Sequence, residues 1–112
     1  MSFHFLQSLF NPQSIAVIGA SSRPQRIGNV VMRNLLAGGF GGVIMPVNPK
    51  RKAVAGVLTY PDVAALPQTP DLVVVCTPAR TVPDLIEQCG ELHIPGVIIL
   101  SVHSDEEYLL RA

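Results

Sequence analysis

The residues best suited to chemistry follow the first apolar run, in the stretch IAVIGASSRPQRIG of residues 15–28. A tight turn of small residues is expected after a strand here, formed by Gly19, Ala20, Ser21 and Ser22. Backbone N–H groups in such a turn, together with the start of the next helix, attract phosphate. Gly28 would let that helix pack close to the strand, but the spacing G-A-S-x6-G differs from the G-x-G-x-x-G of dinucleotide sites. The turn predicts an anion site, with a purely structural role as the alternative.

A run of three cations follows the second apolar run, in the stretch PVNPKRK. In a typical NAD site the second strand ends in an acid that binds the adenosine ribose, whereas no acidic residue precedes Asp62 in this chain. The pattern therefore disfavours NAD. Lys50, Arg51 and Lys52 instead suit a phosphate carried on the ribose, as in coenzyme A (CoA) or NADP. A solvated basic loop without a ligand is the alternative interpretation.

A third loop, CTPAR at residues 76–80, follows the third apolar run. Thr77 can cap the next helix, with Pro78 at its first position. The loop is expected at the carboxyl end of a strand beside the first one. Small residues there would let a narrow chain such as pantetheine pass.

Four short apolar runs supply the strands that position these loops: SIAVIG (14–19), GVIMPVN (42–48), DLVVVCT (71–77) and GVIILS (96–101). Because they do not alternate with polar residues, they predict strands covered on both faces, as in a parallel sheet. A further short strand is expected at Val57 to Thr59, and the stretch YPDVAALP predicts a helix of one or two turns.

Two segments between the runs have helical spacing. The first, IGNVVMRNLLAGGF, places Ile27, Val31, Leu35 and Leu36 on one side and ends at a Gly38-Gly39 stop. The second, TVPDLIEQCGELHIP, runs from a cap at Thr81 to a stop at Pro95. This alternation predicts a Rossmann-like, doubly wound parallel α/β sheet in three αβα layers, with its ligand at the carboxyl ends of the strands.

The length of 112 residues predicts one domain, 1–112. The final stretch HSDEEYLLRA predicts the start of a helix, and such a sheet normally adds another strand. We therefore expect a fold truncated at its C-terminal edge, in the N-terminal fragment of a longer protein. With no apolar run of about 18 residues and no secretory leader, a cytoplasmic protein without a membrane span is expected.

Net charge is zero, but the six cations before Asp62 give the N-terminal half +6 and leave the C-terminal half −6. Five of those six cations follow predicted strands in two short segments, which suits a compact, multiply charged small molecule better than nucleic acid. Cys76 and Cys89 lack metal-ligand spacing and are predicted to be reduced structural thiols.

Several separated motifs resemble one family. The stretches SIAVIGAS, VNPKRK, VVVCTPA and GVIILS resemble the CoA-binding domain of the succinyl-CoA synthetase α-subunit group and of related ADP-forming acyl-CoA synthetases. LFNPQSIAVIGAS, MRNLLAGGF and KAVAGVLTYPDVAALPQTPDL are similar to the N-terminal region of bacterial protein lysine acetyltransferases. In those long proteins a synthetase-like part precedes a GNAT-type acetyltransferase domain. The resemblance covers about residues 9–101.

The resemblance implies a coenzyme site in three parts. The first turn would face the coenzyme, with a cation near a phosphate, through Gly19, Ala20, Ser21 and Arg26. The loop for the adenosine 3′-phosphate end matches Asn48, Pro49, Lys50 and Arg51. The loop beside the diphosphate and pantetheine arm matches Thr77, Pro78 and Ala79. The synthetase phosphohistidine belongs to a following domain, so His4, His93 and His103 match nothing catalytic, and SVHSDEEY stands where synthetases often carry a glycine-rich turn.

These observations predict a module that binds CoA or acetyl-CoA and has no chemistry of its own. No nucleophilic set, carboxylate pair or metal-ligand cluster stands out in the sequence. Its expected partners are the coenzyme and the downstream domains of a parent acetyltransferase or acyl-CoA synthetase, and an exposed sheet edge favours a homodimer. The alternatives are an NADP-binding oxidoreductase domain and an interaction module that has lost its ligand.

Overall fold

The computed structural model describes residues 10–100. Its centre is a four-stranded sheet in the order β2-β1-β5-β6, with every neighbouring pair parallel. Its strands are β1 (Ser14–Ile18), β2 (Val43–Val47), β5 (Leu72–Val75) and β6 (Gly96–Ile99). Every residue of β1 and β5 is buried, as continuous apolar runs require of central strands. The predicted strands and the parallel sheet are confirmed.

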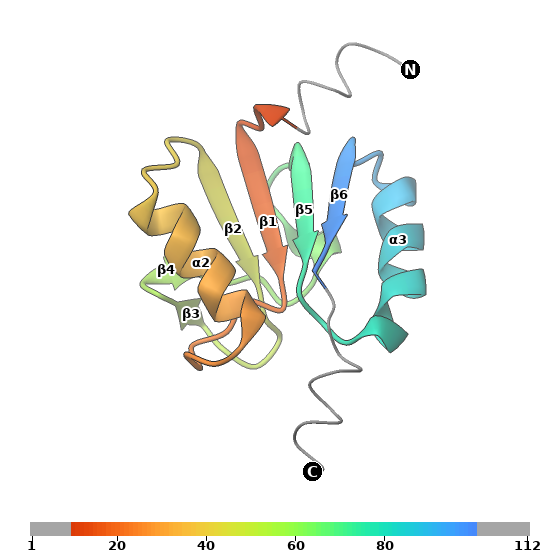
Figure 1. The fold of residues 1–112 in the computed structure, drawn as a ribbon. Helices are drawn as coiled ribbons and strands as arrows, with labels where there is room; N and C mark the ends of the chain where they lie inside the picture. Colours follow the sequence, from red (N-terminus) through yellow and green to blue (C-terminus); the bar gives the residue numbers. More distant parts are fainter. Residues whose placement is uncertain (1–9, 101–112) are drawn as a thin grey trace.

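Helices cover both faces of the sheet, which confirms the three-layer arrangement (Figure 1). On one face Met32 of α2 (Ile27–Ala37) packs with Ile15 and Val17 of β1. On the other face Cys89 of α3 (Val82–Glu91) packs with Ile18 of β1. Because successive side chains of a strand point to opposite faces, β1 contributes to both cores.

The buried side of α2 matches the predicted one in part. Val31 and Leu35 pack against the core as expected, whereas Leu36 is 43% exposed, and the most buried residues of the helix are Gly28, Asn29 and Met32. The close approach of Gly28 to the turn after β1 orients the helix, so the row that continues from Gly28 to Met32 faces the sheet. The helix ends as predicted, with Gly38 as its C-cap.

The second helix ends earlier than the predicted stop at Pro95. Its last residue is Glu91, Leu92 is the C-cap, and His93 takes a left-handed backbone conformation with φ 57°. A left-handed residue just after a helix is a common way to end it. Thr81 does precede α3, but its hydroxyl makes no capping hydrogen bond and instead donates to the carbonyl oxygen of Pro78.

Short elements occupy the connections. A hairpin of β3 (Ala53–Val54) and β4 (Val57–Leu58) contains the predicted short strand together with a partner that the sequence analysis missed. The helix expected in YPDVAALP is a single 3-10 turn, η1 (Val63–Ala65), which begins where the Asp62 carboxylate accepts the Ala65 N–H. Another 3-10 turn, η2 (Ala79–Thr81), precedes α3. The N-cap residue of η2 is Pro78 and not Thr77, whereas the N-cap residue of α3 is Thr81, as predicted.

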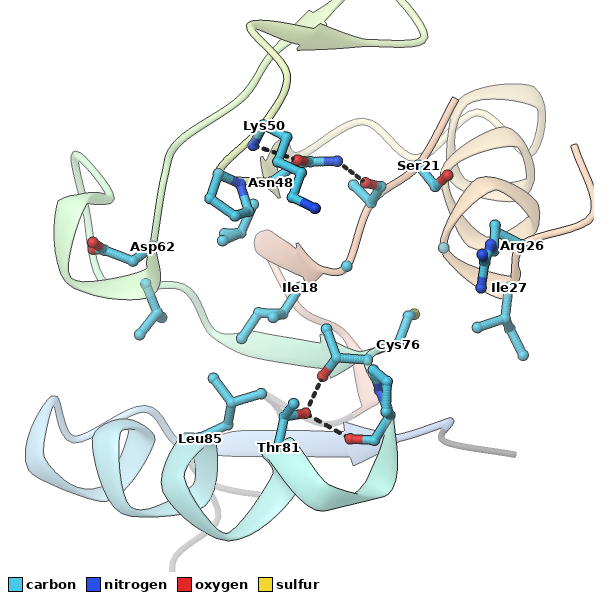
Figure 2. Close-up of a pocket in the computed structure, with 18 of the residues that line it drawn as sticks. Ile18, Ser21, Arg26, Ile27, Asn48, Lys50, Asp62, Cys76, Thr81 and Leu85 are labelled. Atoms are coloured by element: carbon cyan, nitrogen blue, oxygen red, sulfur yellow. Dashed lines mark hydrogen bonds between the residues drawn. The ribbon is translucent and has the colours of Figure 1, made fainter. Parts of the chain in front are cut away.

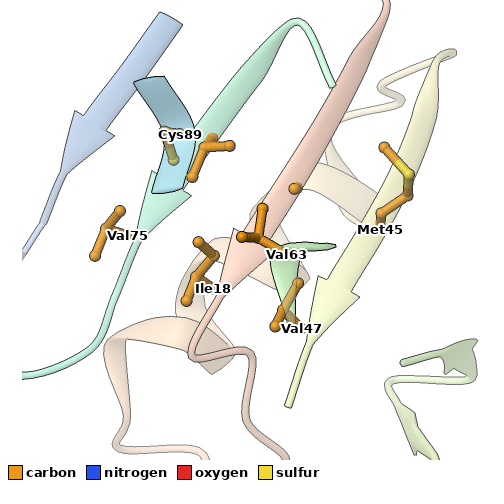
Figure 3. Close-up of a cluster of buried hydrophobic side chains, with 8 residues drawn as sticks. Ile18, Met45, Val47, Val63, Val75 and Cys89 are labelled. Carbon is orange, nitrogen blue, oxygen red and sulfur yellow. The ribbon is translucent and has the colours of Figure 1, made fainter. Parts of the chain in front are cut away.

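Val63 of η1 and Cys89 of α3 pack together on the face of the sheet that Ile18, Val47 and Val75 help to form (Figure 3). The core therefore fixes η1 close to the carboxyl ends of the strands. Both cysteines are free thiols, as predicted. No helix within residues 10–100 has the length and apolar character needed to cross a membrane. The helix expected in HSDEEYLLRA, together with His4 and His103, lies outside the described residues.

Candidate functional site

A cleft of about 820 Å³ lies at the carboxyl ends of β1, β2 and β5 (Figure 2). The three loops picked out from the sequence meet there, because the carboxyl ends of parallel strands share one edge of a sheet. Nine of the twelve predicted site residues line the cleft: Gly19, Ala20, Ser21, Arg26, Asn48, Pro49, Lys50, Thr77 and Pro78. The other three, Ser22, Arg51 and Ala79, do not line it.

The turn after β1 is fixed by backbone contacts. Gly19 has φ +90°, in the region that glycine adopts without strain, and its N–H donates to the Val47 carbonyl oxygen at 3.1 Å. An added Cβ at Gly28 would lie 1.9 Å from the Gly19 carbonyl oxygen. The start of α2 can therefore reach the turn only because residue 28 has no side chain, as the sequence predicted.

Two asparagine side chains also bind the turn. Nδ2 of Asn48 donates to the Ala20 carbonyl oxygen at 2.8 Å, and Nδ2 of Asn29 donates to the Ser21 carbonyl oxygen at 3.0 Å. Asn48 Oδ1 also accepts the Lys50 backbone N–H at 2.8 Å, so this side chain joins the turn to the basic loop. Sequence reasoning missed Asn29, because no local pattern marks a helical asparagine that contacts a residue eight positions earlier.

Two cations, Arg26 and Lys50, line the part of the cleft near the turn after β1, and a third, Arg80, lies on the opposite wall. Arg26 is the N-cap residue of α2, whose first turn holds no acidic residue, and Lys50 belongs to the loop after β2. The N-terminal end of a helix carries partial positive charge, so it adds to the field of these two side chains. This part of the cleft is suited to an anion.

The opposite wall comes from residues that the sequence analysis did not assign to a site. They belong to η1 and to the start of α3 and its preceding turn: Asp62, Val63, Arg80, Thr81, Asp84, Leu85 and Gln88. The spacing of Thr81, Leu85 and Gln88 places them on one face of a helix, which is the signal that could have identified them. Figure 2 shows Leu85 and Thr81 on this side, with the Thr81 hydroxyl 2.6 Å from that of Thr77.

Cys76 lines the cleft as well. Burial raises the pKa of its thiol to about 11, and burial also raises the pKa of the Cys89 thiol. At neutral pH both groups are protonated, and a protonated thiol is a poor nucleophile. Among residues 10–100, no group of three or more His, Cys, Asp or Glu side chains could hold a metal ion. The arrangement is suited to an anionic ligand.

A family model described as a CoA binding domain matches residues 13–112. The chain is 38% identical over 96 residues to an ADP-forming acetate–CoA ligase I of Archaeoglobus fulgidus, covering 86% of this chain and 14% of the relative. It is 40% identical over 100 residues to the α subunit of the ADP-forming acetate–CoA ligase I of Pyrococcus furiosus, covering 86% and 22%. The chain thus spans only about a seventh to a fifth of the length of these curated relatives.

Solved structures agree with these matches. The apo form of a dinucleotide-forming acetyl-coenzyme A synthetase 1 from Ca. Korarchaeum cryptofilum superposes with a TM-score of 0.83 at 36% identity, over 91% of this chain and 22% of that one. A structure from Pyrococcus horikoshii superposes with a TM-score of 0.80 at 36% identity, over 95% and 26%. The fold and the sequence motifs are therefore both similar to those of acetate–CoA ligases and acetyl-coenzyme A synthetases.

Proposed function

The chain belongs to the CoA-binding domain family, and from this premise we propose that its cleft binds CoA or an acyl-CoA such as acetyl-CoA. The turn after β1 and the start of α2 would bind the diphosphate, with Arg26 beside it. The loop at Asn48, Pro49 and Lys50 would hold the adenosine 3′-phosphate end. The module would supply no catalytic group, and the coenzyme would bring the reactive thiol.

One observation carries the proposal: a turn with the geometry of a phosphate site shares a cleft with a basic loop. The second strand is followed by Asn48 and Lys50, where an NAD site would carry an acid. A ligand with a diphosphate and a separate ribose phosphate matches that charge pattern. The cleft volume lies within the usual range of cofactor sites, about 300–1,000 Å³.

The pantetheine arm would pass between the Thr77 and Pro78 loop and the apolar wall formed by Ile18 and Leu85. An apolar lining suits a narrow, weakly polar chain, and the charged ends of the ligand would remain near Arg26 and Lys50. Arg51 and Ala79, which the resemblance assigned to the site, would act at most from its rim. Ser22 is exposed and does not line the cleft, so it would donate its backbone N–H to the ligand from the rim.

The parent protein is proposed to be an ADP-forming acyl-CoA ligase, with its other domains as the partners of this module. The similarity to the ADP-forming acetate–CoA ligases of Archaeoglobus fulgidus and Pyrococcus furiosus supports that choice. An acetyltransferase parent is the second candidate, favoured by the stretches MRNLLAGGF and KAVAGVLTYPDVAALPQTPDL. A GNAT-type domain sequence in the same reading frame would identify the parent as an acetyltransferase. We also propose that the protein is cytoplasmic and has no membrane or nucleic-acid partner. The sheet edge at β6 would pair two copies of the chain into a homodimer, which light scattering would detect.

Calorimetric titration of the 112-residue chain at low salt, with CoA, acetyl-CoA, dephospho-CoA and NADPH, tests the proposal. We expect saturable CoA binding that weakens about tenfold or more without the 3′-phosphate, because charge-assisted hydrogen bonds would be lost. Lys50→Glu should abolish that preference, whereas Lys52→Glu, which changes a cation outside the cleft lining, should keep it. NADPH binding as tight as CoA binding would favour the oxidoreductase alternative. No binding of any of the four ligands by a folded sample would reject the proposal.

A further inference from the structure

Two side-chain amides from different elements hold successive carbonyl groups of the turn after β1. The Asn48 amide, in the loop after β2, donates to the Ala20 carbonyl oxygen at 2.8 Å. The Asn29 amide, on α2, donates to the Ser21 carbonyl oxygen at 3.0 Å. The orientation of two consecutive peptide units is therefore set by side chains that are distant in sequence.

That orientation decides where two N–H groups point. In a planar trans peptide the C=O and N–H bonds point in opposite directions. The bond from Asn48 to Ala20 therefore turns the Ser21 N–H away from Asn48, and the bond from Asn29 to Ser21 turns the Ser22 N–H away from Asn29. Figure 2 shows Asn48 on one side of the turn and Arg26 on the other, so the Ser21 N–H is directed to the Arg26 side of the cleft. Within residues 10–100 neither N–H donates a hydrogen bond to the protein.

Asn29 is a poor choice of residue for packing alone. It is only 8% exposed, and its Oδ1 is buried without a hydrogen-bond partner in the described part of the chain. An unsatisfied buried acceptor is unfavourable, and an apolar side chain of similar size would avoid it. Its amide makes one hydrogen bond, to the Ser21 carbonyl oxygen. This bond is the evident benefit of an asparagine at position 29.

We propose that Asn29 and Asn48 are positioning residues, which aim the Ser22 and Ser21 N–H groups at the diphosphate of the coenzyme. This inference rests on the proposed function of the same cleft. Neither asparagine needs to touch the ligand, since each acts through a carbonyl group of the turn. Asn48 has a second effect, because its Oδ1 accepts the Lys50 N–H and so couples the diphosphate turn to the basic loop.

Leucine substitutions at three asparagines of the full 112-residue chain test this assignment. Asn29→Leu and Asn48→Leu remove the two donors with little change in volume. Asn34→Leu, the same change at an exposed position of α2, is the matched control. Each variant is titrated with CoA and dephospho-CoA by calorimetry and unfolded with urea. Amide NMR spectra are recorded with CoA and with inorganic pyrophosphate.

We expect CoA affinity to fall about tenfold or more in Asn29→Leu and Asn48→Leu and to stay unchanged in Asn34→Leu. The Asn29→Leu urea midpoint should not fall, because the unsatisfied Oδ1 is removed. The preference for CoA over dephospho-CoA should persist in Asn29→Leu and shrink in Asn48→Leu, which also releases the basic loop. Pyrophosphate should shift the Ser21 and Ser22 amide resonances in the unmodified chain, and the Ser22 shift should vanish in Asn29→Leu.

Three results would overturn the assignment. CoA affinity equal to that of the unmodified chain in both variants would refute it while leaving the proposed function intact. A urea midpoint of Asn29→Leu that falls together with its CoA affinity would give Asn29 a structural role only. An unmodified chain whose resonances respond to neither CoA nor pyrophosphate would reject the proposed function as well. If Asn29→Leu does not fold, Asn29→Asp keeps the shape and removes the donor, with Asn34→Asp as its control.

Discussion

Gly28→Ala tests whether the close approach of α2 to the turn after β1 forms the site. The added Cβ would lie 1.9 Å from the Gly19 carbonyl oxygen and 2.8 Å from its carbonyl carbon. Carbon-to-oxygen contacts in proteins begin at about 3.3 Å, so the helix and the turn would have to separate by about 1.4 Å. The opposing atoms belong to the backbone, and no change of rotamer can relieve the overlap.

Two opposing effects set the magnitude. Alanine is favoured over glycine inside a helix by about 1 kcal/mol. Overpacking against well-packed atoms costs about 1–3 kcal/mol and sometimes more. Because rigid backbone faces the new methyl group, we expect the cost to exceed that range, with a net loss of about 2 kcal/mol or more in unfolding free energy. CoA affinity should fall about tenfold or more, since the N–H groups of the turn and the helix would no longer converge.

Gly90→Ala is the matched control, because Gly90 lies in α3 with no atom within 4 Å of an added Cβ. That variant should be more stable by about 1 kcal/mol and should bind CoA normally. Urea unfolding and calorimetric titration measure both quantities. If Gly28→Ala unfolds at the same urea concentration as the unmodified chain and binds CoA equally well, the argument from close approach is wrong.

Three further predictions concern the cores, the end of α3 and the cleft thiol. Met32→Ala should lower the unfolding free energy by about 2–5 kcal/mol because Met32 is fully buried. Leu36→Ala, on the exposed side of α2, should lower it by less than about 1 kcal/mol in the same urea assay. Equal losses in the two variants would contradict the observed orientation of the helix. His93→Gly should raise the unfolding free energy by about 1 kcal/mol, because a φ of 57° is strained for histidine and not for glycine. An unchanged urea midpoint would argue against that strain. Iodoacetamide should alkylate Cys76 of the folded chain slowly at pH 8 and much faster as the pH approaches 11. Burial raises the pKa of the Cys76 thiol from 9.0 to about 11, so the folded state favours the protonated thiol. The stability that Cys76 contributes is therefore fully present below pH 9 and is lost as the pH rises through 11. Rapid labelling of the folded chain at pH 8 would refute the raised pKa.

The sequence by itself determined the sheet and most of one side of the site. Uninterrupted Val- and Ile-rich runs are sufficient to predict buried parallel strands, because such runs cannot leave a face in water. Once the strands are known, the loops after them must meet at one edge. The small-residue turn at Gly19 and the loop at Lys50 could therefore be assigned to one cleft from the printed residues, as the lining of the cleft confirms.

Contacts between distant segments were decided only by the tertiary structure. The rotation of α2 depends on how closely Gly28 can approach Gly19, and hydrophobic periodicity alone placed Leu36 on the wrong side. The wall formed by Leu85 and Gln88 depends on the position at which α3 packs across the sheet. The bonds from Asn29 and Asn48 to the turn exist because folding brings side chains next to carbonyl groups eight and 28 positions away. Local patterns report burial and backbone preference, whereas such bonds depend on distances that are fixed only after the layers have packed.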